Sequence, residues 1–216
     1  MKTHARKKTT ARTAAIPLQK HDDVAWQSER LDSLLSKFDN EKRSDIMRSL
    51  QFARDRHASQ ERHGGAPYVV HPIRLANILV GEWKVTDPDV VSASLLHDII
   101  EDTETSVKDV KAAFGPEVGT LVDGMTMWKG SETYESYVRR IAKGPRELRL
   151  IKCADVLDNL RSWRTCVNES NEKFPRWWHQ ANDYILPMAK ETYAPAAKSI
   201  KTLLNDAWYL KHAHIS

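Results

Sequence analysis

The chain has 216 residues, of which 41% are hydrophobic and 29% charged, and its formal net charge is +4. This length and apolar content suit one domain with its own core, and they exclude a wholly disordered or low-complexity chain. No apolar run approaches the roughly 18 residues that a transmembrane helix needs, so we expect no membrane span. Two cysteines, Cys153 and Cys166, are too few for a disulfide framework or a four-cysteine zinc site, and they favour a reducing compartment such as the cytoplasm.

The start of the chain differs in charge from the rest. Residues 1–20 contain six lysines and arginines and no acid, so without them the net charge of +4 becomes −2 for residues 21–216. We expect residues 1–22 to be a basic, disordered extension, with organelle targeting or a weak nucleic-acid contact as alternatives. We expect residues 23–216 to be the folded domain, and its slightly acidic charge argues against nucleic-acid binding by this part.

After the basic segment the pattern is helical throughout, and no alternating strand pattern of any length occurs. Asp87 and Pro88 begin a helix that we expect to continue to Asp102, and Ser106 with Asp109 resembles a capping box. The sequence therefore predicts an all-α, single-domain bundle of about eight to ten helices. The expected segments are 44–60, 72–80, 90–102, 106–115, 116–125, 134–142, 146–163, 177–188 and 194–210.

One of these helices carries a histidine and three acids among valine, alanine, leucine and isoleucine. On a continuous helix His97 and Glu101 are four residues apart, as are Asp98 and Asp102, so the four side chains would form one ridge. Buried carboxylates this close together repel each other unless protons or a cation neutralise them. We interpret the ridge as a divalent-metal site, and the alternative is a solvent-facing acidic stripe.

Two other segments carry side chains that can complete such a site. In the first, a Gly-Gly-Ala-Pro-Tyr loop leads to His71 and Pro72, and a histidine at the start of a helix is free to bind a ligand. In the second, Asp155 and Asn159 lie four residues apart on one helix face among apolar neighbours. A lone buried aspartate is costly, so Asp155 needs a partner.

Four sequence blocks occur in a fixed order: His-x-x-Gln-x-Arg at 57–62, Pro-Tyr-x-x-His-Pro at 67–72, Leu-Leu-His-Asp-x-x-Glu-Asp-Thr at 95–103 and Lys-x-Ala-Asp-x-x-x-Asn-Leu-Arg at 152–161. Together they resemble the HD-type hydrolase domain of the RelA/SpoT family, specifically its small single-domain alarmone hydrolases. The similarity covers roughly residues 43–165. The resemblance implies an HD-type helical bundle.

The resemblance also implies a site for one divalent ion per chain, usually Mn²⁺ in this family. Glu101 and Asp102 match the family's acidic pair, whose position suits orienting or deprotonating a water molecule. Such an ion would polarise the attacked phosphorus and neutralise developing charge. The implied metal ligands are His71, His97, Asp98 and Asp155.

The family's substrates are guanosine 3′,5′-bispyrophosphates, so the implied reaction is hydrolysis at the ribose 3′ position, giving GDP or GTP and pyrophosphate. A small-molecule nucleotide is then the partner, and a separate alarmone synthetase is a candidate functional partner because this chain shows no synthetase region. Arg62 matches an arginine that packs on the guanine base. Core packing for Tyr68, a helix-to-loop hydrogen bond for Asn159 and a solvated face for Lys152 are the alternatives. The implied substrate contacts are Arg62, Tyr68, Lys152, Asn159 and Arg161.

One departure from the family leaves the substrate open. Many relatives carry a basic-polar pair after the base-stacking arginine, whereas this sequence has His63 and Gly64, which favours adenosine alarmones more than in relatives. The same metal site acting on the 2′-phosphate of NADPH, a non-catalytic nucleotide-binding module and a purely structural bundle are the other hypotheses. The intact acidic and histidine residues argue against a decayed site. The C-terminal tryptophans, Trp177, Trp178 and Trp208, are expected to pack as core.

Overall fold

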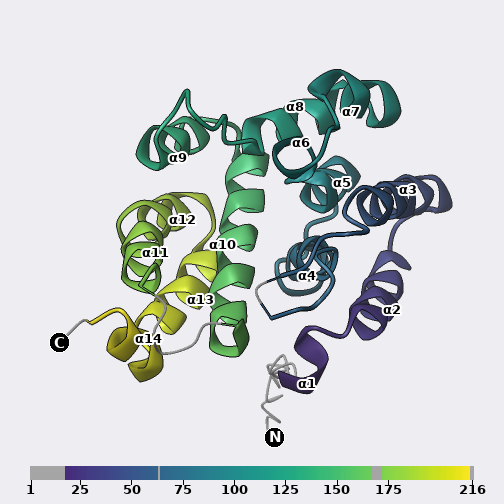
Figure 1. The fold of residues 1–216 in the computed structure, drawn as a ribbon. Coiled ribbons are helices and arrows are strands. Elements are labelled where there is room, and N and C mark those ends of the chain that lie inside the picture. Colours follow the sequence, from purple (N-terminus) through teal and green to yellow (C-terminus); the bar gives the residue numbers. More distant parts are fainter. Residues whose placement is uncertain (1–17, 63, 167–171, 215–216) are drawn as a thin grey trace, which may run out of the picture.

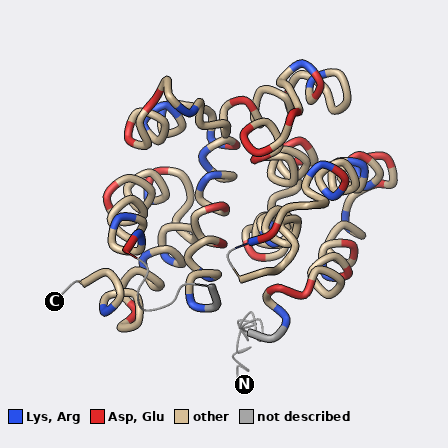
Figure 2. Tube along the Cα trace, in the orientation of Figure 1, with Lys and Arg blue, Asp and Glu red and all other residues tan. Residues whose placement is uncertain are grey.

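A long central helix divides the molecule into two halves. The computed structural model describes residues 18–62, 64–166 and 172–214, so the predictions for residues 1–17 and for His63 lie outside it. The helices within residues 18–114 lie on one side of the central helix, α10 (Arg146–Cys166), and those within residues 134–142 and 174–212 lie on the other (Figure 1). Buried apolar side chains from both halves join in one cluster through α10. Lysines, arginines and acids are spread over both halves (Figure 2).

The first half packs around two almost completely buried helices. All eight residues of α4 (Val70–Asn77) are buried, and α4 continues as a short π-helix, η1 (Ile78–Glu82). In α5 (Pro88–Leu96) every residue from Val90 onwards is buried. These two helices and α10 carry the side chains considered below. The other helices of this half are α1 (Leu18–His21), α2 (Val24–Leu35), α3 (Asn40–Arg56), α6 (Ile99–Asp102), α7 (Val107–Phe114) and α8 (Pro116–Met125).

The second half is held by aromatic packing. Phe174 and Trp178 are buried, and the indole N–H of Trp178 donates to the carbonyl of Leu204 at 3.1 Å. Trp163 of α10 stacks on Trp177 with 5.6 Å between ring centroids. These contacts fix the C-terminal helices against α10. The helices of this half are α9 (Tyr134–Ala142), which precedes α10, and α11 (Phe174–Gln180), the π-helix η2 (Ala181–Ile185), α12 (Leu186–Thr192), α13 (Ala194–Leu204) and α14 (Ala207–His212), which follow it.

The all-α prediction is confirmed, and local caps account for several boundaries. The helices at 116–125 and 134–142 have the expected bounds. The capping box of Ser106 and Asp109 is present, with both reciprocal hydrogen bonds. The described residues contain more helices than expected because three predicted helices are each divided into two α-helices, and because α1 and α2 precede the first expected segment. At one division Asp206 accepts a hydrogen bond from the backbone N–H of Trp208 and starts a new helix.

The prediction of one continuous helix from 90 to 102 is wrong. α5 ends at Leu96, and α6 begins only at Ile99. Asp98 between them has φ −101° and ψ 0°, which lies in the bridge region rather than the helical one. No glycine or proline marks the break, so local propensity gives no warning of it. The four acidic and histidine side chains therefore do not form the single straight ridge that the spacing indicated.

The folded body begins before the expected boundary at residue 22. Leu18–His21 form α1, and the imidazole of His21 is buried, with its Nε2 3.1 Å from the hydroxyl of Ser162. The carboxylate of Asp22 accepts a hydrogen bond from Arg74 at 2.6 Å. The last residues of the predicted tail thus contact the core helices. In the described part of the chain, no helix combines the length and apolarity that crossing a bilayer would require.

Candidate active site

Two histidines and two aspartates from distant parts of the sequence meet between α4, α5 and α10. The Nε2 atom of His71 lies 3.3 Å from an oxygen of Asp155 and 3.9 Å from an oxygen of Asp98. The Nε2 atom of His97 lies 2.8 Å from the same Asp98 oxygen. His71, His97 and Asp98 each offer a ligand atom within 4.8 Å of the others. The structure therefore brings together all four residues that the sequence analysis named as metal ligands.

The break between α5 and α6 aims two consecutive residues at one point. On a continuous helix the side chains of His97 and Asp98 would diverge by about 100°. The backbone change at Asp98 instead leaves its carboxylate beside the His97 ring. The departure from the predicted helix is thus what makes both side chains available to one ion.

Both imidazoles are held through Nδ1, which leaves Nε2 facing the carboxylates. The Nδ1 of His97 is 2.9 Å from the carbonyl oxygen of Ser94, to which a protonated Nδ1 donates. The Nδ1 of His71 is 2.7 Å from a carboxylate oxygen of Asp158. The buried Nε2 of His97 lies 2.8 Å from an oxygen of Asp98, although this contact lacks the angles of a hydrogen bond. Fixed rings with an exposed lone pair are typical of metal-bound histidines, so these residues fit a divalent ion.

The charges of the site favour ionised carboxylates. Burial opposes ionisation of Asp98, but His97 and His71 outweigh it and hold the pKa of this carboxyl well below its usual value. For Asp155 burial is likewise outweighed, chiefly by Lys152, and its pKa is also strongly lowered. Asp98 in turn raises the pKa of His97 to about 9 despite the burial of the ring. A divalent cation that binds here would replace the His97 proton as the partner of these carboxylates.

The predicted acidic pair lies on α6 at a more open edge of the site. One oxygen of Glu101 accepts the backbone N–H of Met127 at 3.1 Å. The ammonium of Lys129 lies 3.3 Å from the other Glu101 oxygen and 3.6 Å from Asp102. The amide of Gln60 donates to the backbone carbonyl of Asp102 at 2.7 Å. The pair is thus held by the segment that carries Met127 and Lys129 on one side and by Gln60 on the other.

Three of the predicted substrate contacts form a chain of hydrogen bonds to the ligands. The guanidinium of Arg62 donates to the amide oxygen of Asn159 at 2.8 Å, and the Asn159 amide donates to Asp155 at 2.8 Å. The hydroxyl of Tyr68 donates to Asp98, and its ring lies 5.7 Å below the Arg62 guanidinium. A molecule that contacts Arg62 would therefore be linked to the proposed ligand Asp155 by two hydrogen bonds, Arg62 to Asn159 and Asn159 to Asp155.

The other two predicted substrate contacts are paired inside the protein. Lys152 is buried, donates to Asp155 at 2.8 Å and lies 4.9 Å from the ring centre of Tyr137. Arg161 makes two hydrogen bonds to Glu82, at 2.6 and 2.8 Å. The solvated face that was the alternative for Lys152 is therefore not what the structure has. A direct contact of Lys152 or Arg161 with substrate stays a prediction.

The sequence analysis missed two residues that support the site. Asp158 and Arg74 are both buried and form a two-bond ion pair beside His71. Asp158 follows Asp155 by three residues in an apolar helix, which was a signal for a second buried carboxylate that needs a partner. His57 lies outside the ligand group, with its Nδ1 2.7 Å from Gln60 and its ring against Tyr68.

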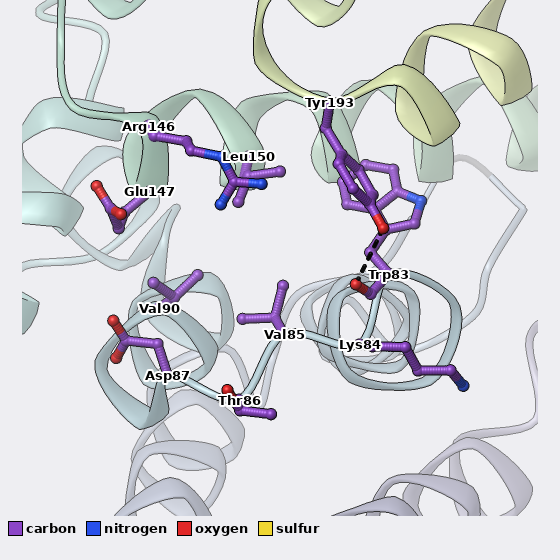
Figure 3. A pocket seen from close by; sticks show the side chains of 10 residues that line it. All are labelled: Trp83, Lys84, Val85, Thr86, Asp87, Val90, Arg146, Glu147, Leu150 and Tyr193. Carbon is purple, nitrogen blue, oxygen red and sulfur yellow. Dashed lines mark hydrogen bonds between the residues drawn. The ribbon is translucent and has the colours of Figure 1, made fainter.

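A cavity of about 230 Å³ lies elsewhere, where η1 leads into α5 beside the start of α10 (Figure 3). None of the predicted site residues lines it. Tyr193 closes one side and donates a hydrogen bond to the carbonyl of Trp83 at 3.3 Å, while the Lys84 side chain points away (Figure 3). The cavity offers no histidine or paired acids in the arrangement that a metal needs. We therefore place the candidate active site at the histidine-aspartate group.

Comparison with known protein families matches residues 49–178 to the HD domain, more than half of the chain. The matched range includes every predicted metal ligand. The chain belongs to the HD-domain family. The solved structure of a metazoan protein, described as an ortholog of SpoT that hydrolyzes ppGpp, shares this HD-domain fold with a TM-score of 0.70. It is 30% identical, and the match covers 80% of this chain and 97% of that one.

Relatives of this HD-domain protein include guanosine-3′,5′-bis(diphosphate) 3′-pyrophosphohydrolases. The one named MESH1 from Danio rerio is 35% identical over 129 residues, which are 57% of this chain and 72% of that protein. The one from Aquifex aeolicus is 33% identical over 198 residues, which are 86% of this chain. The chain spans only 26% of the length of the Aquifex protein, so it corresponds to one part of that longer relative.

Proposed function

We propose that the chain hydrolyses the 3′-pyrophosphate of guanosine 3′,5′-bis(diphosphates), and that one Mn²⁺ per chain serves the reaction. The observation that carries the proposal is the group of two buried imidazoles and the Asp98 carboxylate, with the Asp155 carboxylate 3.3 Å from one of the imidazoles. The names of the relatives support the substrate. Two nitrogen and two oxygen donors suit a hard to borderline divalent ion. The residues proposed to hold it are His71, His97, Asp98 and Asp155.

A bound divalent ion would lower the pKa of a water molecule and offset the charge that develops on the attacked phosphate. In the reaction the water oxygen bonds to the phosphorus next to the ribose, the bond from that phosphorus to the 3′ oxygen breaks, and the 3′ oxygen takes a proton. The products are GDP or GTP and pyrophosphate. The protein's own task is therefore to accept one proton, supply another and hold the nucleotide still.

We assign proton transfer to the acidic pair at the open edge. The backbone N–H of Met127 holds one oxygen of Glu101, and we assign the other oxygen, 3.3 Å from the Lys129 ammonium, to receive a proton from water. Asp102, one residue on, orients that water or returns a proton to the leaving oxygen. The Lys129 ammonium lies against both carboxylates and offers them a positive charge at the open edge.

We assign nucleotide binding to the chain of hydrogen bonds that reaches the ligands. Arg62 offers its guanidinium plane to the base, and Tyr68 and Asn159 line the same pocket. Lys152 acts on substrate through Asp155, and Arg161 meets phosphate only if its pair with Glu82 opens. A cytoplasmic location and a separate alarmone synthetase as functional partner remain predictions from the sequence.

Product analysis tests the function. The purified chain is incubated with Mn²⁺ and, separately, ppGpp, pppGpp, ppApp or NADPH, with an Asp98→Ala variant as control. Pyrophosphate released from the guanosine compounds, and absent in the control, is the expected result. Turnover of ppApp or NADPH alone would keep the metal site and contradict the substrate. Mn²⁺ binding without any turnover would point to another phosphoester, and no binding and no turnover would favour a nucleotide-binding module.

A further inference from the structure

Asp158 is a buried carboxylate to which the proposed reaction gives no task. It lies on α10 and is 1% exposed, yet both of its oxygens are occupied. One oxygen is 2.7 Å from the Nδ1 of His71 and 2.9 Å from Arg74, and the other is 2.8 Å from Arg74. A buried ion pair recovers its desolvation cost only with such complete hydrogen bonding, and an apolar pair of the same size often serves stability as well. The contact with His71 distinguishes this pair from a merely structural one.

Arg74 holds that carboxylate from the same helix as His71, three residues further along α4. Every nitrogen of its guanidinium has a partner. Besides Asp158, it donates to Asp22 at 2.6 Å, to the carbonyl of His21 at 3.2 Å and to Ser162 at 2.8 Å. Arg74 therefore ties three parts of the chain together at one point: the N-terminal segment, α4 and α10.

The pair sets the direction of the His71 ring. Arg74 makes two hydrogen bonds to the Asp158 carboxylate, and one of the two carboxylate oxygens is also 2.7 Å from the Nδ1 of His71. A charged carboxylate that accepts the Nδ1–H fixes the tautomer, turns Nε2 towards Asp155 and makes the ring a better electron donor. His97 has only a neutral carbonyl, that of Ser94, in the same role.

We propose that Asp158 and Arg74 are positioning residues that hold His71 ready to bind a divalent cation, and that His21 and Asp22 hold Arg74 in place. This rests on the metal site of the proposed function. It makes the first described residues of the chain part of the support of a metal ligand located about fifty residues later. A structural pair alone would stabilise the fold and leave metal affinity unchanged.

Metal binding without substrate tests the proposal. Mn²⁺ is titrated into the purified full chain, and free Mn²⁺ is followed by its electron paramagnetic resonance signal. Loss of a supporting partner of a metal-bound histidine weakens affinity by about 10- to 100-fold, which is the loss expected for Asp158→Asn. Glu82→Gln is the matched control, because Glu82 also makes two bonds to an arginine, Arg161, without contacting a predicted ligand. It should bind Mn²⁺ within about twofold of the wild type.

Equal affinity in Asp158→Asn and wild type would overturn the positioning role while leaving the proposed function intact. A wild-type chain that binds no Mn²⁺ would overturn both. Asp22→Asn, at the more exposed end of the network, should lose less affinity than Asp158→Asn, and an equal or larger loss would contradict the assigned order of support.

A measurement on the unaltered chain covers the case in which Asp158→Asn fails to fold. Nitrogen-15 NMR of histidine-labelled wild-type protein, recorded without metal at a pH where the ring is neutral, reports the tautomer of each imidazole. The His71 signals are assigned by their absence from a His71→Gln variant. We expect His71 to carry its proton on Nδ1, facing Asp158. A proton on Nε2 would overturn the proposal, because the ring would then present no lone pair to a cation.

Discussion

The two sides of the candidate site differ in how firmly the protein holds them. On the ligand side His71 and His97 are each 1% exposed and Asp155 9%, and each Nδ1 has a partner within 2.9 Å, whereas Asp98, at 23%, faces the open edge. On the acidic side Glu101 and Asp102 are 21% and 35% exposed and face Lys129 at 3.3 Å or more. A fixed cluster suits an ion that must stay, whereas an open edge suits water and substrate that must enter and leave. We therefore expect the histidine-aspartate side to bind the metal ion and the Glu101–Asp102 side to transfer protons.

Asp98→Ala should produce the largest effect, because it removes a carboxylate from the fixed side. We expect loss of stoichiometric Mn²⁺ and a fall in kcat/KM of roughly 10³-fold or more, since a bound ion supplies much of the acceleration in such enzymes. Metal content by mass spectrometry and pyrophosphate release measure the two effects. Asp183→Ala, an exposed acid on η2, is the control and should retain both. A metal-free Asp98→Ala enzyme with unreduced turnover would refute the ligand role.

Glu101→Gln should reduce turnover without reducing metal binding, and so distinguish the tasks of the two sides. The amide keeps the size of the side chain but cannot accept a proton, so kcat should fall by about 10²- to 10⁴-fold. The Mn²⁺ stoichiometry should not change, because Glu101 is assigned to the open side. Glu104→Gln, at an exposed position three residues on, should leave kcat unaltered. Loss of metal together with kcat would show that the two sides are not independent.

Lys129→Ala should have a modest effect that depends on salt. Lys129 is 68% exposed, and exposed ion pairs contribute about 0.2–1 kcal/mol, so KM for a polyanionic nucleotide should rise by about two- to fivefold at low ionic strength. The difference should shrink at high salt as the charges are screened. Lys190→Ala is the control at an exposed position on α12. A salt-independent rise in KM would point to a direct hydrogen bond instead.

The smallest expected effect is in the chemical labelling of Cys153, a buried residue that lies on α10 two residues before Asp155. Burial raises the pKa of its thiol to about 12, and at pH 8 the reactive thiolate is therefore scarce. Iodoacetamide should leave Cys153 unmodified in the native chain and modify it after unfolding in urea, as peptide mass mapping can show. Rapid native labelling would mean that the fixed side opens more often than its packing indicates.

Much of the site could be predicted because four sequence blocks resemble a known family, and because some of their residues also have distinctive local settings. His71 precedes a proline at a helix start, and Asp155 and Asn159 keep helical spacing in an apolar segment. Their meeting is then favoured by burial, since α4, most of α5 and the face of α10 that carries Asp155 are buried in the core. The all-α class follows from the same periodicity.

What the sequence could not give depends on contacts between distant elements. The break at Asp98 has no glycine or proline to announce it, so tertiary packing overrides the local pattern. Nothing in the local sequence distinguished Arg74 from the other arginines, because its partner Asp158 lies 84 residues away in the chain. For Lys152 the sequence left a substrate contact and a solvated face as alternatives. Spacing along one helix does not reveal that the ring of Tyr137 covers this side chain.

The break between α5 and α6 also constrains how this protein can evolve. Because His97 and Asp98 serve one point from consecutive positions, a single inserted or deleted residue there would turn one of them away by about 100°. The dipeptide can therefore be inherited only as a block, whereas the loop between α8 and α9 can change in length without moving any ligand. A change in that loop would instead move Met127 and Lys129, and so alter the acidic side while the metal ligands stay in place.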